Sequence, residues 1–238
     1  MTSGTDDHAP ERAVPAATVV LLRDRDHGVE TLMVRRDQNL AFAGGAWVFP
    51  GGRVDPEDYA SGIEVETADD VAVLAAARTA AARETAEEAG LRIDGDTLVW
   101  FSHWTPAPRL ATRRFSTWFF AGHAPDGEVV IDDGEIRAHE WVRPVDVLAR
   151  HRAGDIELLP PTWMTLVDLS RDASVDALLA RFRSRPAVYY LSNIARRADG
   201  ITVALWDGDV GYDDGNADRP GARHRLVMDP SGWELEQT

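Results

Sequence analysis

The chain has 238 residues, 44% of them hydrophobic and 27% charged, which is ordinary for one globular domain with an added segment. Its formal net charge of −15 argues against a protein whose main partner is the nucleic-acid backbone or an anionic membrane surface. Cysteine is absent, so disulfides, thiolate zinc sites and cysteine nucleophiles are excluded, and the cytoplasm is the expected compartment. No apolar run approaches membrane-spanning length.

The first expected elements are a polar tail and a β-hairpin. Residues 1–14 are polar and aperiodic, which predicts a disordered tail. From Ala16, the apolar runs AATVVLLRD and VETLMVRR flank a polar turn, which predicts two paired strands. A short aromatic strand at 47–49 follows, and the glycine pair Gly51 and Gly52 predicts a sharp turn after it.

The most regular expected element is an alanine-rich helix over about residues 69–90. Capping residues begin at Thr67, and the run VAVLAAARTAAARETAEEA contains strong helix formers throughout. Gly90 is the expected helix stop, because glycine readily adopts the left-handed conformation that ends many helices.

Beyond this helix the pattern predicts strands, then helices, then strands again. The strand-like runs are TLVWFSHW, RRFSTWFFAG, EVVI and EWV. Two or three helices are expected in PVDVLARH, PTWMTLVDL and SVDALLARF, whose apolar residues recur at helical spacing. Strand-like runs return at 188–191, 201–206 and 224–228. We expect residues 185–238 to form a C-terminal extension, whose strand edges can pair with a second copy of the chain in a homodimer.

Three glutamates on the predicted helix form the main candidate site. Glu84, Glu87 and Glu88 stand at i, i+3 and i+4, so their carboxylates share one face within a single turn. Like charges in this arrangement repel one another unless a cation neutralises them, and carboxylate oxygens suit Mg²⁺ or Mn²⁺. Arg83, one turn before Glu87, can orient a carboxylate or balance the charge. Taken alone, such a run is more often a solvated helix face, so the neighbouring sequence decides between that interpretation and a metal site.

That context resembles the Nudix box, whose usual form is G-x5-E-x7-R-E-U-x-E-E-x-G-U with U aliphatic. Residues 83–91, RETAEEAGL, fill the second half, with Thr85 in place of the aliphatic residue. Counting back from Arg83 with the usual spacing places Asp69 at the position of the leading glycine and Ala75 at the position of the first glutamate. The glycines that would begin the box lie further upstream, in the run FPGGR. This indicates an insertion of about seventeen residues, the offset between Gly52 and Asp69. An interrupted box after VFPGG is similar to the branch of peroxisomal coenzyme A diphosphatases, Nudix-type motif 19.

The resemblance covers about residues 16–169 and implies a fold and an activity. The implied fold is an α/β/α sandwich with a mixed sheet, here over residues 15–184 with trailing helices, followed by the extension. The implied reaction is the Mg²⁺- or Mn²⁺-dependent hydrolysis of a diphosphate linkage in a small nucleoside diphosphate derivative. Coenzyme A, acyl-coenzyme A, NADH and ADP-ribose belong to that class of substrate.

The resemblance also assigns roles to residues of the site. The metal ligands would be Glu84, Glu87 and Glu88, joined by the backbone carbonyl of Gly52. Arg83 would be the catalytic arginine of the box. Glu135, in the run EIRAHEW, stands where many such enzymes carry a loop glutamate that acts as the base, and Glu88 is the alternative. The sequence identifies no substrate-binding residues.

Two other functions are compatible with these residues. One is a regulatory module of the same fold that binds a nucleotide without turnover, but relatives of that kind tend to lose the box glutamates. The other is a scaffold whose acidic helix face contacts a partner, which predicts no affinity of that face for divalent cations. The complete set of Arg83 and the three glutamates favours the enzyme.

Overall fold

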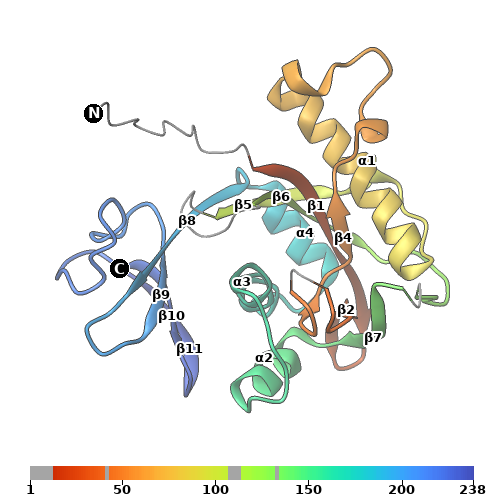
Figure 1. Ribbon diagram of the computed structural model, residues 1–238. Helices are drawn as coiled ribbons and strands as arrows, with labels where there is room; N and C mark the ends of the chain where they lie inside the picture. The colour runs from red at the N-terminus through yellow and green to blue at the C-terminus, as the bar shows by residue number, and fades with distance from the viewer. Residues whose placement is uncertain (1–12, 41–42, 107–113, 132–133) are drawn as a thin grey trace.

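One mixed sheet runs through the structure, a computed structural model that describes residues 13–40, 43–106, 114–131 and 134–238 (Figure 1). Its strands are β1 (Val14–Arg25), β2 (Gly28–Arg36), β3 (Trp47–Val48), β4 (Gly51–Arg53), β5 (Val99–Pro106), β6 (Phe115–His123), β7 (Ile136–Val142), β8 (Val188–Arg196), β9 (Thr202–Leu205), β10 (His224–Asp229) and β11 (Gly232–Gln237). The order is β11-β10-β9-β8-β5-β6-β1-β2-β3, with β4 paired to β1 and β7 to β2. The β1–β6 and β5–β8 pairs are parallel and the other pairs antiparallel.

Helices cover both faces of the main sheet (Figure 1). Along β1, Val19 and Leu21 join one hydrophobic cluster while Val20 and Leu22 join another, because successive side chains of a strand point to opposite faces. The helix α1 (Asp70–Ala89) packs on the first face. The helices α2 (Pro144–Arg152), α3 (Pro160–Leu169) and α4 (Val175–Arg183) pack on the second. The expected α/β/α sandwich and trailing helices are therefore confirmed.

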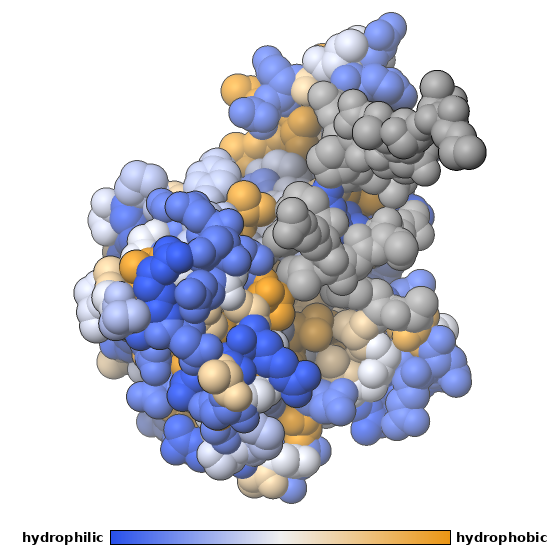
Figure 2. Space-filling model, turned by 60° about the vertical axis from the view of Figure 1, so that its left-hand side comes forward, coloured by the Kyte–Doolittle hydropathy of each residue, from blue (hydrophilic) through white to orange (hydrophobic). Residues whose placement is uncertain are grey.

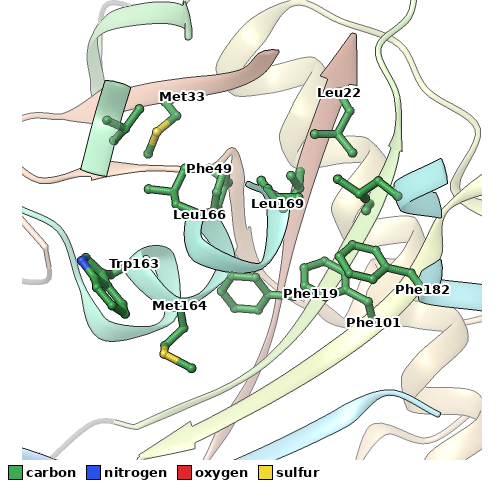
Figure 3. Close-up of a cluster of buried hydrophobic side chains, with 14 of the residues drawn as sticks. Leu22, Met33, Phe49, Phe101, Phe119, Trp163, Met164, Leu166, Leu169 and Phe182 are labelled. Atoms are coloured by element: carbon green, nitrogen blue, oxygen red, sulfur yellow. The ribbon is translucent and has the colours of Figure 1, made fainter. Parts of the chain in front are cut away.

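The two faces are filled by different kinds of side chain. Under α1 the helix presents fully buried alanines, Ala76, Ala77, Ala80 and Ala81, whose small size lets the helix backbone lie close to the sheet. The opposite face holds large aromatic rings (Figure 3). There Phe182 of α4 stacks on Phe101 of β5 at a centroid distance of 4.3 Å. Close packing places α1 near enough to the sheet for its polar side chains to reach β4.

Two expectations at the sheet margins are wrong. Residues 128–131, the run EVVI, form no strand; Val130 donates its N–H to the carbonyl of Ala89 at 2.9 Å, so this segment crosses the end of α1 and satisfies a free helix carbonyl. Gly51 and Gly52 do not form a sharp turn but lie in β4, extended against β1. The strand β11 had no expected counterpart.

The C-terminal strands continue the sheet through β8. Residues Val188 to Ser192 of β8 pair with β5, and Asn193 to Arg196 pair with β9, so one strand serves both parts. In Figure 1 the strands β9 to β11 project away from α1, and Figure 2 shows that this side is largely hydrophilic with hydrophobic residues in small groups. The expected tail falls mainly on residues 1–12, outside the described part, and β1 begins at Val14. No described helix is long and apolar enough to cross a membrane.

Candidate functional site

The site is built where β4 meets the last two turns of α1. The backbone N–H of Gly51 donates to Oε2 of Glu88 at 2.9 Å. A Cβ atom on Gly52 would lie 2.3 Å from the Glu84 carboxylate, and one on Gly51 would lie 2.3 Å from the carbonyl oxygen of Ala17. The backbone contact of Gly51 leaves no room for a side chain, whereas a side chain at position 52 would displace the Glu84 carboxylate. The strand backbone and the helix carboxylates are therefore in direct contact.

Local chemistry sets the ends of the helix that carries these carboxylates. Asp69 caps its N-terminus by accepting the N–H of Ala72 at 2.8 Å. Gly90 ends it in the left-handed conformation, with φ of 67°, as expected. Thr85, which replaces the aliphatic residue of the box, is fully buried and donates its hydroxyl to the carbonyl of Ala81 at 2.7 Å. The substitution therefore leaves no polar group unpaired.

Arg83 connects the helix to the segment after β4. Its Nε and Nη2 donate to the two carboxylate oxygens of Asp58 at 3.0 and 2.8 Å, and Nη2 also donates to the carbonyl of Arg53. Its Nη1 donates to Glu84 at 3.0 Å and to Glu87 at 3.2 Å. A bidentate pair with a buried carboxylate fixes the guanidinium plane, so Arg83 in turn orients both glutamates.

Asp58 is a site residue that the sequence reading missed. It is only 6% exposed and closes the short 3₁₀ turn η1 (Pro56–Asp58), where it also accepts the N–H of Asp55 at 2.8 Å. The spacing from Gly52 to Asp58 is G-x5-D, which matches the first half of the box with aspartate in place of glutamate. Counting forward from Gly52, instead of back from Arg83, finds this residue and places the insertion after it.

The two inner glutamates lie in surroundings that disfavour their negative charge. Burial raises the pKa of Glu88 to about 8, the Glu84 carboxylate adds to the rise, and the Gly51 N–H opposes it. Burial also raises the pKa of Glu84, against the opposing effect of Arg83. The side chain of Glu87 is 59% exposed at the rim. The buried carboxyl group of Glu88 and the partly buried one of Glu84, both with raised pKa values, form a site where a cation can take the place of a proton.

Glu135 is linked to the same site through Arg36. Arg36 is the last residue of β2, and its Nη2 lies 3.2 Å from Oε2 of Glu135 while its Nη1 lies 3.8 Å from Oε1 of Glu88. Arg36 had no place in the sequence reading, because nothing in the local pattern of β2 marks it. The proximity of Arg36 to Glu135 can be recognised only from the pairing of β2 with β7.

The donor set suits a hard divalent cation. Its members are carboxylate oxygens on a rigid helix and the backbone of a glycine cradle, the ligand types that Mg²⁺ and Mn²⁺ accept. Among the described residues, however, no three His, Asp or Glu side chains are already gathered in position to hold a metal ion. Arg83 forms ion pairs with both Glu84 and Glu87. The structure thus brings Gly52, Glu84 and Glu88 together and leaves Glu87 at the edge.

Comparison with known proteins agrees with this geometry. The family model described as NUDIX domain matches residues 12–161. The chain belongs to the NUDIX family. NUDIX hydrolases generally act on nucleoside diphosphate derivatives and use divalent cations such as Mg²⁺ or Mn²⁺. No curated protein sequence matches the chain significantly.

Solved structures of NUDIX proteins are similar to the chain to different degrees, and the first one below shares its fold. A NUDIX hydrolase from Alicyclobacillus acidocaldarius is 24% identical, with 72% of this chain and 97% of that chain covered and a TM-score of 0.62. The NUDIX domain of Shewanella oneidensis NrtR, crystallised with ADP ribose, is 16% identical over 74% and 90% of the two chains, with a TM-score of 0.48. A C. elegans Ap4A hydrolase is 20% identical over 72% and 96%, with a TM-score of 0.38. The last two similarities are too low to support an inference about substrate.

Proposed function

We propose that the protein is a divalent-metal-dependent diphosphatase that hydrolyses the diphosphate linkage of a nucleoside diphosphate derivative. The observation that carries the proposal is the meeting of Gly51 and Gly52 with Glu84 and Glu88. It brings a glycine backbone, the carboxyl groups of Glu84 and Glu88 and the arginine of the NUDIX helix together. A solvated acidic helix face has no reason to pack two of its carboxyl groups against a strand and to bury one of them.

Each residue then has a definite task. Glu84, Glu87, Glu88 and the carbonyl of Gly52 would hold the cation. When bound, the cation would offset the negative charge of the diphosphate and draw electron density from phosphorus. Arg83 keeps Glu84 and Glu87 at the helix surface through its two-point contact with Asp58.

Glu135 is the proposed base that takes the proton of the attacking water. Its side chain is 59% exposed, so water reaches it freely. Glu88, the alternative, is only 6% exposed and already accepts the Gly51 N–H. A carboxylate that holds a cation and a backbone N–H has little remaining capacity to accept a proton, so the geometry favours Glu135 for this step.

The proposed substrate range is coenzyme A or acyl-coenzyme A, NADH, ADP-ribose or a similar compound. Coenzyme A and acyl-coenzyme A are included because of the interrupted box. The insertion in the box follows Asp58 and runs through the short turn η2 (Val65–Thr67) to α1. The NUDIX fold itself specifies the diphosphate chemistry, while the loops select the rest of the substrate.

The test is a turnover screen of the full chain with a coupled phosphatase that releases phosphate from the products. Coenzyme A, NADH, ADP-ribose and diadenosine polyphosphates are each offered with Mg²⁺, with Mn²⁺ and with EDTA. The test variant is Glu87→Gln, whose exposed side chain should leave folding intact. The matched control is Glu66→Gln, an exposed glutamate of the insertion away from the carboxylate cluster.

Metal-dependent turnover that Glu87→Gln abolishes and Glu66→Gln retains would support the diphosphatase and identify its substrate class. Tight binding of a nucleotide without turnover would instead favour the regulatory module. Equal activity of wild type and Glu87→Gln would contradict the assignment of the site.

The cytoplasmic location and the homodimer remain predictions from the sequence. Multi-angle light scattering after size exclusion measures the mass in solution, for which one chain contributes 26.2 kDa. A mass close to that of one chain at micromolar concentration would contradict the homodimer.

A further inference from the structure

Arg36 lies opposite a β-bulge of β7, beside the carboxylates of the site. Along the β2–β7 ladder Arg35 pairs with Ala138 but Arg36 pairs with Ile136, so Arg137 is the extra residue on β7. Bulges interrupt the regular alternation of a strand and redirect a side chain, and they are frequent beside active sites. Here the extra residue is on β7, so the bulge brings Glu135, which directly precedes β7, closer to Arg36. The guanidinium of Arg36 lies between Glu135 and Glu88 of α1.

The backbone of Arg36 is held on both sides. Its N–H donates to the carbonyl of Ala46 at 3.1 Å, and its own carbonyl accepts the N–H of Gly45 at 3.2 Å. The side chain is 18% exposed, and its Nε is buried with no hydrogen-bond partner among the described residues. A buried cation with one unsatisfied N–H is costly to keep, so its remaining contacts, which are to carboxylates, must compensate for it.

The chain around Glu135 is attached to β2 independently of that contact. The N–H of Asp37 donates to the carbonyl of Glu135 at 2.7 Å, and Arg137 forms an ion pair with the Asp37 carboxylate. These links hold the backbone of this segment beside β2. The Arg36–Glu135 contact at 3.2 Å is a separate link, because it acts on the carboxylate and not on the backbone.

We propose that Arg36 is a positioning residue that holds the Glu135 carboxylate on the Glu88 side of the site. The inference rests on the proposed function, in which Glu135 accepts the proton of the attacking water. Two carboxylates facing one shared space repel each other, and a guanidinium between them offsets that repulsion. Without Arg36, the Glu135 carboxylate would lose this ion pair while its backbone stayed in place.

The geometry favours this role over direct substrate binding. A guanidinium that captures a phosphate presents its paired N–H groups to open space, as a two-point fork. In Arg36 one of the two terminal nitrogens faces Glu135 and the other faces Glu88, and its Nε is buried. The charge of Arg36 is thus directed at carboxylates of the protein.

The test is a double-mutant cycle of Arg36→Gln and Glu135→Gln, with the best substrate from the turnover screen. The control is Arg35→Gln, because Arg35 precedes Arg36 on the same strand but is exposed. We expect Arg36→Gln to lower kcat roughly 10- to 100-fold, the loss typical of a displaced catalytic group. KM should stay within about twofold, because groups that bind substrate are untouched. The double variant should be no slower than Glu135→Gln, because Arg36 acts through Glu135.

A Mn²⁺ titration followed by electron paramagnetic resonance gives a second readout. Arg36→Gln removes a positive charge near Glu88, so its Mn²⁺ affinity should be equal to or higher than that of the wild type. Weaker Mn²⁺ binding would mean that the substitution disturbs the metal ligands, and it would overturn the inference.

The kinetic outcomes separate the inference from the function on which it rests. Additive losses in the cycle, or a rise in KM larger than the fall in kcat, would reject the positioning role while leaving the diphosphatase intact. Absence of metal-dependent turnover in the wild type would reject both.

Discussion

The buried ion pair of the C-terminal strands gives a sharp stability prediction, made with Asp209→Asn. Arg225 of β10 donates from Nε and Nη2 to the two oxygens of Asp209, both at 2.6 Å, and from Nη1 to the carbonyl of Ala217. The side chains are 2% and 0% exposed. Asparagine keeps the shape but leaves the charge of Arg225 buried and unpaired. Breaking such a pair costs about 3–5 kcal/mol, so we expect a loss of that size at pH 7.

The same ion pair predicts how the difference in unfolding free energy between wild type and Asp209→Asn depends on pH. Burial alone would raise the pKa of Asp209. Hydrogen bonds from Arg225, His224 and Gly211 outweigh this effect and lower the pKa from 3.8 to about 2. A carboxylate with a depressed pKa in the folded state stabilises the fold above its unfolded pKa and loses that contribution as pH falls towards the folded value. The pKa difference corresponds to roughly 2 kcal/mol, of which about 1 kcal/mol is lost between pH 5 and pH 3.

Urea unfolding followed by circular dichroism measures both quantities, with linear extrapolation at each pH. Asp176→Asn is the control, because the Asp176 side chain is 90% exposed and its contact with His123 lies in solvent. The gap in unfolding free energy between wild type and Asp209→Asn should narrow from pH 5 to pH 3. A loss below about 1 kcal/mol at pH 7, or a gap that does not change with pH, would refute the reasoning.

Three further substitutions test the site and the core. Gly52→Ala places a Cβ 2.3 Å from the Glu84 carboxylate, so we expect kcat to fall at least about tenfold with little change in melting temperature; unchanged kinetics would contradict the cradle. Asp58→Asn weakens the bidentate contact with Arg83 and should lower both kcat, measured by steady-state kinetics, and the melting temperature, measured by calorimetry. Phe182→Ala removes a ring that is 1% exposed and stacked on Phe101, and should cost about 3–5 kcal/mol in urea unfolding with the site geometry retained.

The sequence by itself determined the elements whose causes are local. The helix α1 follows from helix-forming residues between the cap at Asp69 and the left-handed Gly90, and contacts within one turn set those ends. The spacing of Glu84, Glu87 and Glu88 places them on one face for the same reason. The continuous apolar run along β1 indicates a strand, and its apolar residues are buried on both faces.

Only the tertiary structure decided which segments meet. Residues 128–131 have the composition of a strand, but the free carbonyl at the end of α1 offered a better partner for Val130 than a sheet edge. Arg36 and Glu135 are separated by 99 residues and face each other because a bulge shifts the β2–β7 register. The contact of Asp58 with Arg83 likewise spans the insertion, although the G-x5-D spacing marks Asp58 itself. Pairing, burial and register depend on contacts between distant parts of the chain, and such contacts leave no trace in a local pattern of residues.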